Sequence, residues 1–113
     1  MTRRFIAALL VVVAAPLAVG GARADCYDVF GCSNRDLFRM QDLVNGPNCE
    51  FLYTMRNAIY AQHGYCFRTK RGIATFGNAN CVSSNPEALG LNRVERANAA
   101  TILKAERQLG CPE

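Results

Sequence analysis

Three residues with functional side chains lie at helical spacing in the middle of the chain. Arg56, Tyr60 and His63 are four and three positions apart, which places them on one face of a helix. His63 is the single histidine of the sequence, and its ordinary pKa lies near neutral pH. This face could bind an anionic or saccharide ligand, and the imidazole could act as an acid or a base. The structural alternative is a hydrogen-bond network in which His63 bonds the last carbonyls of its helix.

Further candidate ligand-binding residues flank this face. The rings of Tyr60, Tyr65 and Phe67 can stack on sugars, although core packing is the commoner role of aromatic residues in a small domain. A short basic cluster after the helix could meet an acidic polymer, although a few exposed charges are usually a solvated surface. The full set of candidate ligand-binding residues is Arg56, Asn57, Tyr60, His63, Tyr65, Arg68, Lys70 and Arg71.

The sequence gives little support for a metal site, a cofactor or a nucleophilic catalytic residue. His63 and Cys66 form an H-x-x-C pair, but no second close ligand pair accompanies them, so we expect no metal site. No spacing suggests a Ser-His-acid arrangement, and we expect no cofactor and no catalytic residue. Glu95 and Glu106 each precede an arginine and are expected on the surface of their helix, where nothing would raise the pKa of a general acid.

The N-terminus has the pattern of a cleavable export signal. Two arginines precede a nearly uninterrupted apolar run from Phe5 to Val19, and Ala22-Arg23-Ala24 matches an A-x-A cleavage site. We therefore expect residues 1–24 to be a signal peptide that is removed. The alternative is a retained membrane anchor, but the run reaches the roughly 20 residues that span a bilayer only if Gly20 and Gly21 are counted.

Cleavage changes the charge of the protein. The leader carries three of the thirteen Lys and Arg residues and none of the nine acids, so its removal lowers the net charge from +4 to +1. A nucleic-acid-binding function thereby loses its main support. We expect a periplasmic or secreted protein with no stable membrane insertion after cleavage.

All six cysteines follow the expected cleavage site, and an even number in a short exported chain predicts a disulfide framework. A chain of this size buries only about 60–65% of its unfolded surface. Disulfides, which typically add about 2–4 kcal/mol each, supply the stability that such a small core lacks.

Helical periodicity dominates the expected mature chain and predicts an all-α, disulfide-stapled domain of three to four helices. Residues 25–48 form an N-terminal segment with a short helix that begins at Ser33 or Asn34, and residues 49–113 form the main helical domain. In the second part we expect a helix over 49–63 that Asn48 caps, that Gly64 ends and that carries Leu52, Met55 and Ile59 on one face. One or two helical turns over 69–76 and a last helix that Asn92 and Glu95 cap are expected to follow. The apolar residues expected to face inward include Leu37, Phe51, Ile73, Phe76 and Leu109.

Helix geometry narrows the 15 pairings that six cysteines allow. A helix of about 13 residues holds Cys49 and Cys66 about 20 Å apart, whereas a disulfide requires Cα atoms within about 7 Å. If the second and last helices are antiparallel, Cys49 meets Cys111 at one end and Cys66–Cys81 closes the other. Cys26–Cys32 closes a short local loop, which completes the predicted set.

The run Met55 to Phe67 resembles the YARHG domain family, which is named for a Tyr-Ala-Arg-His-Gly motif that an Arg-Asn-x-Ile sequence typically precedes. Tyr60, Ala61, His63 and Gly64 match the motif, and Gln62 stands where the family has arginine. The resemblance extends over about residues 49–111. It implies an extracytoplasmic domain linked to the cell envelope, with no established activity or catalytic residue.

Two hypotheses of function follow. The first is a non-enzymatic exported module that binds a cell-envelope component, such as peptidoglycan, or another exported protein, through the Arg56, Tyr60 and His63 face and the loop 68–71. The alternative is a small enzyme that acts on envelope glycan and uses His63 as its acid or base. The sequence leaves the oligomeric state open.

Overall fold

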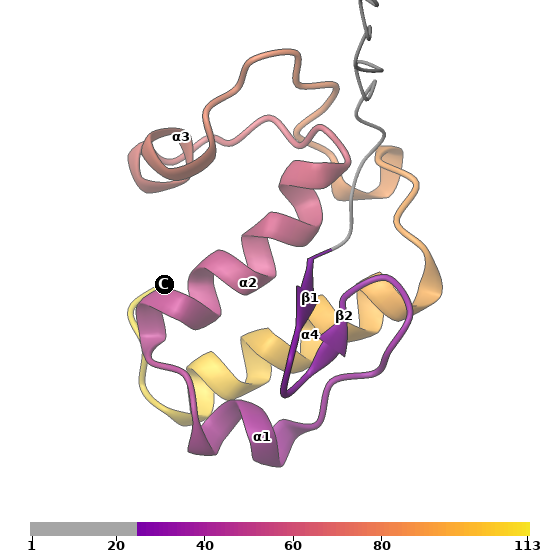
Figure 1. Cartoon of the computed structure of the whole chain (residues 1–113). Coiled ribbons are helices and arrows are strands. Elements are labelled where there is room, and N and C mark those ends of the chain that lie inside the picture. The colour runs from indigo at the N-terminus through magenta and orange to yellow at the C-terminus, as the bar shows by residue number, and fades with distance from the viewer. Residues whose placement is uncertain (1–24) are drawn as a thin grey trace, which may run out of the picture.

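The computed structural model describes residues 25–113 and shows a helical domain with one small hairpin (Figure 1). The expected signal peptide, residues 1–24, lies outside the described residues. The all-α fold class is confirmed. The sequence pattern does not predict the hairpin, because each of its strands has only two residues. The elements of the described chain are β1 (Cys26–Tyr27), β2 (Gly31–Cys32), α1 (Met40–Asn45), α2 (Cys49–Gln62), α3 (Lys70–Phe76), the 3-10 turn η1 (Pro86–Ala88) and α4 (Arg93–Gln108).

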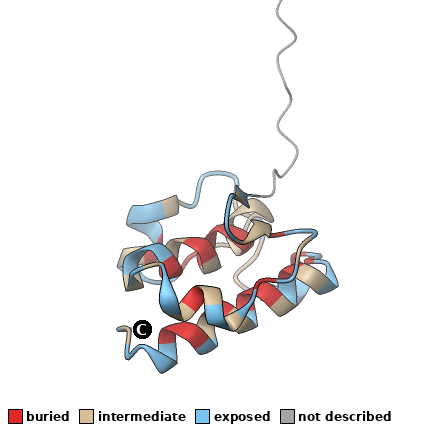
Figure 2. Ribbon diagram, turned by 60° about the horizontal axis from the view of Figure 1, so that its bottom comes forward, coloured by how far each residue is buried: buried red, intermediate tan, exposed pale blue. Residues whose placement is uncertain are grey.

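The antiparallel helices α2 and α4 form the centre of the domain. The start of α2 is linked to the end of α4 by the Cys49–Cys111 disulfide, and α1 packs against α4 while α3 packs against α2 (Figure 1). The buried residues gather on the facing sides of these helices (Figure 2). The cluster of fully buried or nearly buried apolar residues comprises Phe38, Leu43, Leu52, Met55, Ile59, Leu89, Leu91, Ala99, Ile102 and Ala105.

The sequence-predicted caps set the bounds of the two long helices. Asn48 accepts a hydrogen bond from the Phe51 N–H at the start of α2. Asn92 and Glu95 form the expected capping box at the start of α4. Gly64 follows α2 with φ +81°, a conformation that glycine adopts without steric cost. These local signals explain why both long helices lie where the periodicity places them.

The first helix starts later than the predicted Ser33 or Asn34. α1 begins at Met40, and residues 33–36 form a turn instead, in which the Asp36 carboxylate accepts from the Cys32 N–H. This hydrogen bond, followed by the interaction with Arg35, lowers the pKa of Asp36. The extended stretch that follows leaves Leu37 67% exposed, so its predicted inward position is wrong.

A buried asparagine of α4 holds this segment in place. The side-chain oxygen of Asn98 accepts from the Phe38 N–H at 2.8 Å, and its amide group donates to the carbonyls of Ser33 and Asp36 at 3.0 and 2.8 Å. Backbone groups that would otherwise continue a helix are thereby satisfied by a side chain 60 or more residues away in the sequence.

We expect Asn98→Ala to lower the free energy of unfolding by about 3 kcal/mol, since it removes three hydrogen bonds worth about 1 kcal/mol each. Urea unfolding monitored by circular dichroism measures this loss. The control is Asn85→Ala, which removes an exposed asparagine that accepts one capping hydrogen bond from the Glu87 N–H and should cost about 1 kcal/mol or less. Equal stabilities of the two variants would contradict the role of Asn98.

Other predicted inward positions also differ from the structure. Phe51, Ile73 and Leu109 are 45%, 44% and 42% exposed. In the short helix α3 the buried residue is Gly72, where an added Cβ would lie 2.6 Å from the Phe67 ring, so Ile73 faces outward. Leu109 follows the last turn of α4. Phe76 is half-buried and stacks on Phe67, with ring centroids 5.0 Å apart.

Three disulfides cross-link the domain. They join Cys26 to Cys32, Cys49 to Cys111 and Cys66 to Cys81, the set that helix geometry predicts. The first closes the hairpin, the second links α2 to the C-terminal tail, and the third fixes the segment after α2 to the loop before η1.

Burial of the hairpin tyrosine predicts sensitivity to alkali. Burial, together with the charge and hydrogen bond of Asp25, raises the pKa of Tyr27 from 10.0 to about 12. The unfolded chain therefore loses this proton near pH 10 while the folded chain retains it, so stability falls between pH 10 and 12. We expect Tyr27→Phe to show a smaller decline in this window, as rapid urea unfolding at each pH measures. An equally steep decline in the variant would contradict the prediction.

Candidate functional site

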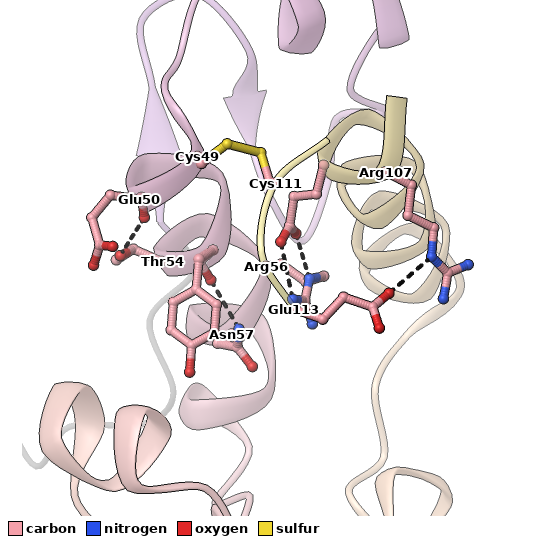
Figure 3. Close-up of polar contacts among 10 residues, drawn as sticks. Cys49, Glu50, Thr54, Arg56, Asn57, Arg107, Cys111 and Glu113 are labelled. Carbon is pink, nitrogen blue, oxygen red and sulfur yellow. Dashed lines mark hydrogen bonds and ion pairs between the residues drawn. A yellow bond between two sulfur atoms is a disulfide. The ribbon is translucent and has the colours of Figure 1, made fainter. Parts of the chain in front are cut away.

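An ion pair and a histidine–carboxylate hydrogen bond connect α2 with α4. Arg56 in α2 places Nε 2.5 Å from Glu106 Oε1 and Nη2 3.1 Å from Oε2, a bidentate arrangement. The side chains are 18% and 4% exposed. Burial by itself would lower the pKa of Arg56, but the hydrogen bonds and charge of Glu106 raise it. Figure 3 shows Arg56 reaching from α2 toward α4.

The second contact joins the end of α2 to the start of α4. His63 Nε2 lies 2.7 Å from Glu95 Oε2, while Glu95 Oε1 accepts from the Asn92 N–H in the capping box. His63 is the C-cap residue of α2 and Glu95 lies in the first turn of α4. The histidine that the sequence places at the end of a helix therefore bonds a carboxylate of the neighbouring helix.

The expectation that Glu95 and Glu106 lie on the helix surface is wrong, because both are buried, at 4% and 3% exposure. Residues adjacent in a helix point in directions about 100° apart, so only one member of each Glu-Arg pair faces α2. One signal was present in the sequence. The first long helix carries two bases, Arg56 and then His63, and the last helix carries two acids, Glu95 and then Glu106. When the two helices are antiparallel, the first base lies near the second acid and the second base lies near the first acid.

A pocket of about 350 Å³ lies beside the Arg56–Glu106 pair, and we call it the arginine pocket. Three arginines line it together with the aromatic rings of Tyr53, Tyr65 and Phe67. Among the residues that the structure describes, Glu113 is the one acidic residue of the lining. The lining residues are Tyr53, Arg56, Asn57, Tyr65, Phe67, Arg68, Thr69, Leu103, Arg107 and Glu113.

The three arginines come from different elements. Arg56 belongs to α2, Arg68 to the segment before α3, and Arg107 to the last turn of α4. Arg107 Nε lies 3.3 Å from Glu113 Oε1, and these side chains are 65% and 75% exposed (Figure 3). An exposed pair of this kind contributes little stability, so Glu113 is held only weakly against Arg107.

The segment that carries Tyr65, Phe67 and Arg68 is held on both sides. Tyr65 pairs with Ser83 in a single parallel bridge, and Cys66 is bonded to Cys81. The Asn78 side chain accepts from the Phe67 N–H at 2.7 Å and donates to the Phe67 carbonyl at 2.9 Å. The aromatic wall of the arginine pocket is therefore fixed before any ligand arrives.

The rest of the basic cluster has other neighbours. The Arg71 guanidinium lies 3.6 Å from the centroid of the Tyr53 ring and 2.7 Å from Glu50 Oε2. It therefore stabilises the packing of α3 on α2. Lys70 is exposed at the first position of α3.

The arginine pocket brings together four of the eight predicted site residues, Arg56, Asn57, Tyr65 and Arg68. The other four lie outside its lining. Tyr60 lines an adjacent pocket of about 320 Å³, which shares Arg56 and Leu103 with the arginine pocket. Phe67, whose ring the sequence suggests for sugar stacking, is buried in the core at 6% exposure. Tyr53 and Arg107 of the arginine pocket were missed, because their approach depends on how α2, α4 and the Cys66 segment pack.

The described residues carry no arrangement suited to a metal or to a membrane span. Cys66 is oxidised in a disulfide, so the H-x-x-C pair presents no thiolate. Within residues 25–113, His, Cys, Asp and Glu side chains form no group of three that could hold a metal ion. In the same range the helices lack the length and apolar composition needed to cross a membrane.

Comparison with known proteins identifies a family but no individual relative. A family model described as the YARHG domain matches residues 33–107, which is well over half of the chain. The matched range includes α1, α2, α3 and most of α4. No curated protein and no solved structure matches the chain.

Proposed function

The chain belongs to the YARHG domain family, and on that premise we propose that it is a non-enzymatic periplasmic or secreted module that binds an anionic component of the cell envelope, with peptidoglycan as the first candidate. The observation that carries the proposal is the arginine pocket, where three guanidinium groups and three aromatic rings line one opening.

The chemistry of the arginine pocket suits an acidic glycan. Guanidinium groups bind carboxylates in a bidentate manner, and the half-buried ring of Tyr65 can pack against the apolar face of a sugar. Peptidoglycan offers sugars and carboxylates side by side. Arg68 and Arg107 are the accessible cations, whereas Arg56 directs Nε and Nη2 to Glu106 and serves mainly to position the wall.

Export is supported by the covalent framework. Three disulfides in a chain of 113 residues are typical of an oxidising compartment. The apolar leader of residues 1–24 adds the sequence pattern of an export signal. Both features agree with a periplasmic or secreted location.

Co-sedimentation with purified peptidoglycan tests the proposal, using oxidised protein purified after expression of the full chain. We expect Arg68→Ala with Arg107→Ala to weaken binding about tenfold or more, since tenfold corresponds to about 1.4 kcal/mol. The matched control is Arg93→Ala with Lys104→Ala, which removes two exposed cations of α4 outside the pocket lining. Equal binding by both double variants, or no sedimentation of the unaltered protein, would reject the pocket as the site.

The alternative is an envelope enzyme that uses His63 as its acid or base. It is favoured by one observation, the carboxylate of Glu95 that holds the imidazole at 2.7 Å, an orienting arrangement also found in catalytic histidines. Release of soluble fragments from peptidoglycan by the pure protein, abolished by His63→Gln, would establish this function. We expect no release, because His63 lies outside the arginine pocket.

A further inference from the structure

A second concave surface lies on the hairpin side of the domain. A groove of about 630 Å³ runs between the hairpin and the α1–α2 turn, and we call it the hairpin groove. Its apolar lining comes from Val29, Phe30, Pro47 and Phe51. Val29 is 72% exposed and Phe51 45% exposed. Apolar side chains gathered around one concave surface commonly mark an interaction site.

The groove continues into a neighbouring hollow of about 350 Å³ beside the hairpin turn. This hollow shares Val29, Phe30 and Phe51 with the hairpin groove and adds Cys26, Tyr27 and Asp28 to its lining. The two hollows therefore form one continuous surface that the side chains of Val29, Phe30 and Phe51 connect.

Every charged residue that lines the two hollows is acidic. Asp42 and Glu50 line the hairpin groove and Asp28 lines its continuation. Among residues 25–113, no lysine or arginine contributes to either lining. One oxygen of Glu50 bonds Arg71, and the carboxylate remains 71% exposed. This surface is therefore opposite in charge to the arginine pocket.

The hairpin groove is held in shape without a ligand. The Cys26–Cys32 disulfide and the β1–β2 pairing close the loop that carries Val29 and Phe30. The Tyr27 ring contacts the rings of Phe30 and Phe51 edge-on, with centroids 6.1 and 6.0 Å apart. A surface fixed in this way loses little conformational freedom when a partner binds.

We propose that the hairpin groove binds a short segment of another exported protein in which apolar side chains alternate with lysine or arginine. The apolar side chains contact Val29, Phe30 and Phe51, and the cations lie against Asp28, Asp42 and Glu50. The groove and the arginine pocket use different residues, so one domain can hold an acidic glycan and a basic protein segment at the same time.

Fluorescence anisotropy with a short fluorescein-labelled peptide of alternating lysine and leucine tests this proposal on the oxidised protein from the full chain. We expect saturable binding that Val29→Ser weakens about tenfold, since burial of a valine side chain contributes about 1.5 kcal/mol. The matched control is Val82→Ser, because Val82 is equally exposed at 72% and lies outside both hollows. Asp28→Asn with Asp42→Asn should weaken binding and reduce its dependence on salt.

Several results would overturn the proposal. They are equal binding of a glutamate-leucine peptide, equal loss in Val29→Ser and Val82→Ser, or no binding of the lysine-leucine peptide. Concentration-dependent dimerisation in sedimentation velocity that Val29→Ser abolishes would assign the groove to a second copy instead. Co-sedimentation of Val29→Ser with peptidoglycan separates the two sites, because we expect it to equal that of the unaltered protein whichever way the peptide experiment ends.

Discussion

Replacing Arg56 with alanine should lower the free energy of unfolding by about 3–5 kcal/mol, because Glu106 would be left as a buried carboxylate without its counter-charge. Glu106 is 3% exposed, and both of its oxygens accept from the Arg56 guanidinium. Urea unfolding at neutral pH, monitored by circular dichroism, measures the loss.

Two further variants separate this ion pair from a general effect of charge. Arg68→Ala removes an exposed cation and should change stability by less than about 0.5 kcal/mol. Arg56→Met with Glu106→Leu replaces the pair by apolar side chains and should recover most of the stability lost in Arg56→Ala. If the double replacement is as unstable as the single one, the loss arises from packing rather than from the unpaired carboxylate.

Removing the Cys49–Cys111 disulfide should cost about 4 kcal/mol, the largest effect among the three bridges. The two cysteines are 62 residues apart in the sequence, and the entropy that a cross-link removes from the unfolded chain grows with the length of the loop it closes. The variant is Cys49→Ala with Cys111→Ala, compared by urea unfolding with the oxidised parent.

The hairpin bridge provides the matched comparison. Cys26 and Cys32 are only 6 residues apart, so Cys26→Ala with Cys32→Ala should cost about 2 kcal/mol on the same argument. Equal losses for the two double variants would contradict the entropic account. The Cys49–Cys111 variant also loosens the tail that carries Glu113, so peptidoglycan binding should be measured only under conditions where it remains folded.

Local sequence signals account for much of the fold. The caps Asn48 and Asn92, the glycine at position 64 and the helical spacing of Leu52, Met55 and Ile59 define α2 and the start of α4. These features act over one or two helical turns, so the sequence reveals them directly. The spacing of the cysteines excludes Cys49–Cys66, and the assumption that the two long helices are antiparallel then predicts the disulfide set that the structure shows.

The N-terminal segment shows where local signals fail. Ser33, Asn34 and Asp36 form a pattern that favours a helix start, yet residues 33–36 form a turn and α1 begins at Met40. The side chain of Asn98, in the last helix, forms hydrogen bonds with three backbone groups of this segment and thereby holds it in a non-helical conformation. The local spacing of apolar and polar residues cannot predict a contact between residues so far apart in the sequence.

The sequence by itself determined a helical domain with six cysteines to pair, and Arg56 and His63 as notable residues. Only the tertiary structure decided what these residues contact, because their partners are 50 and 32 positions away and depend on which faces of α2 and α4 meet. The same packing assembles the arginine pocket from α2, α4, the Cys66 segment and the C-terminal tail, and the hairpin groove from the hairpin, α1 and α2. A helix face is fixed by local spacing, whereas a pocket exists only where faces of different elements converge.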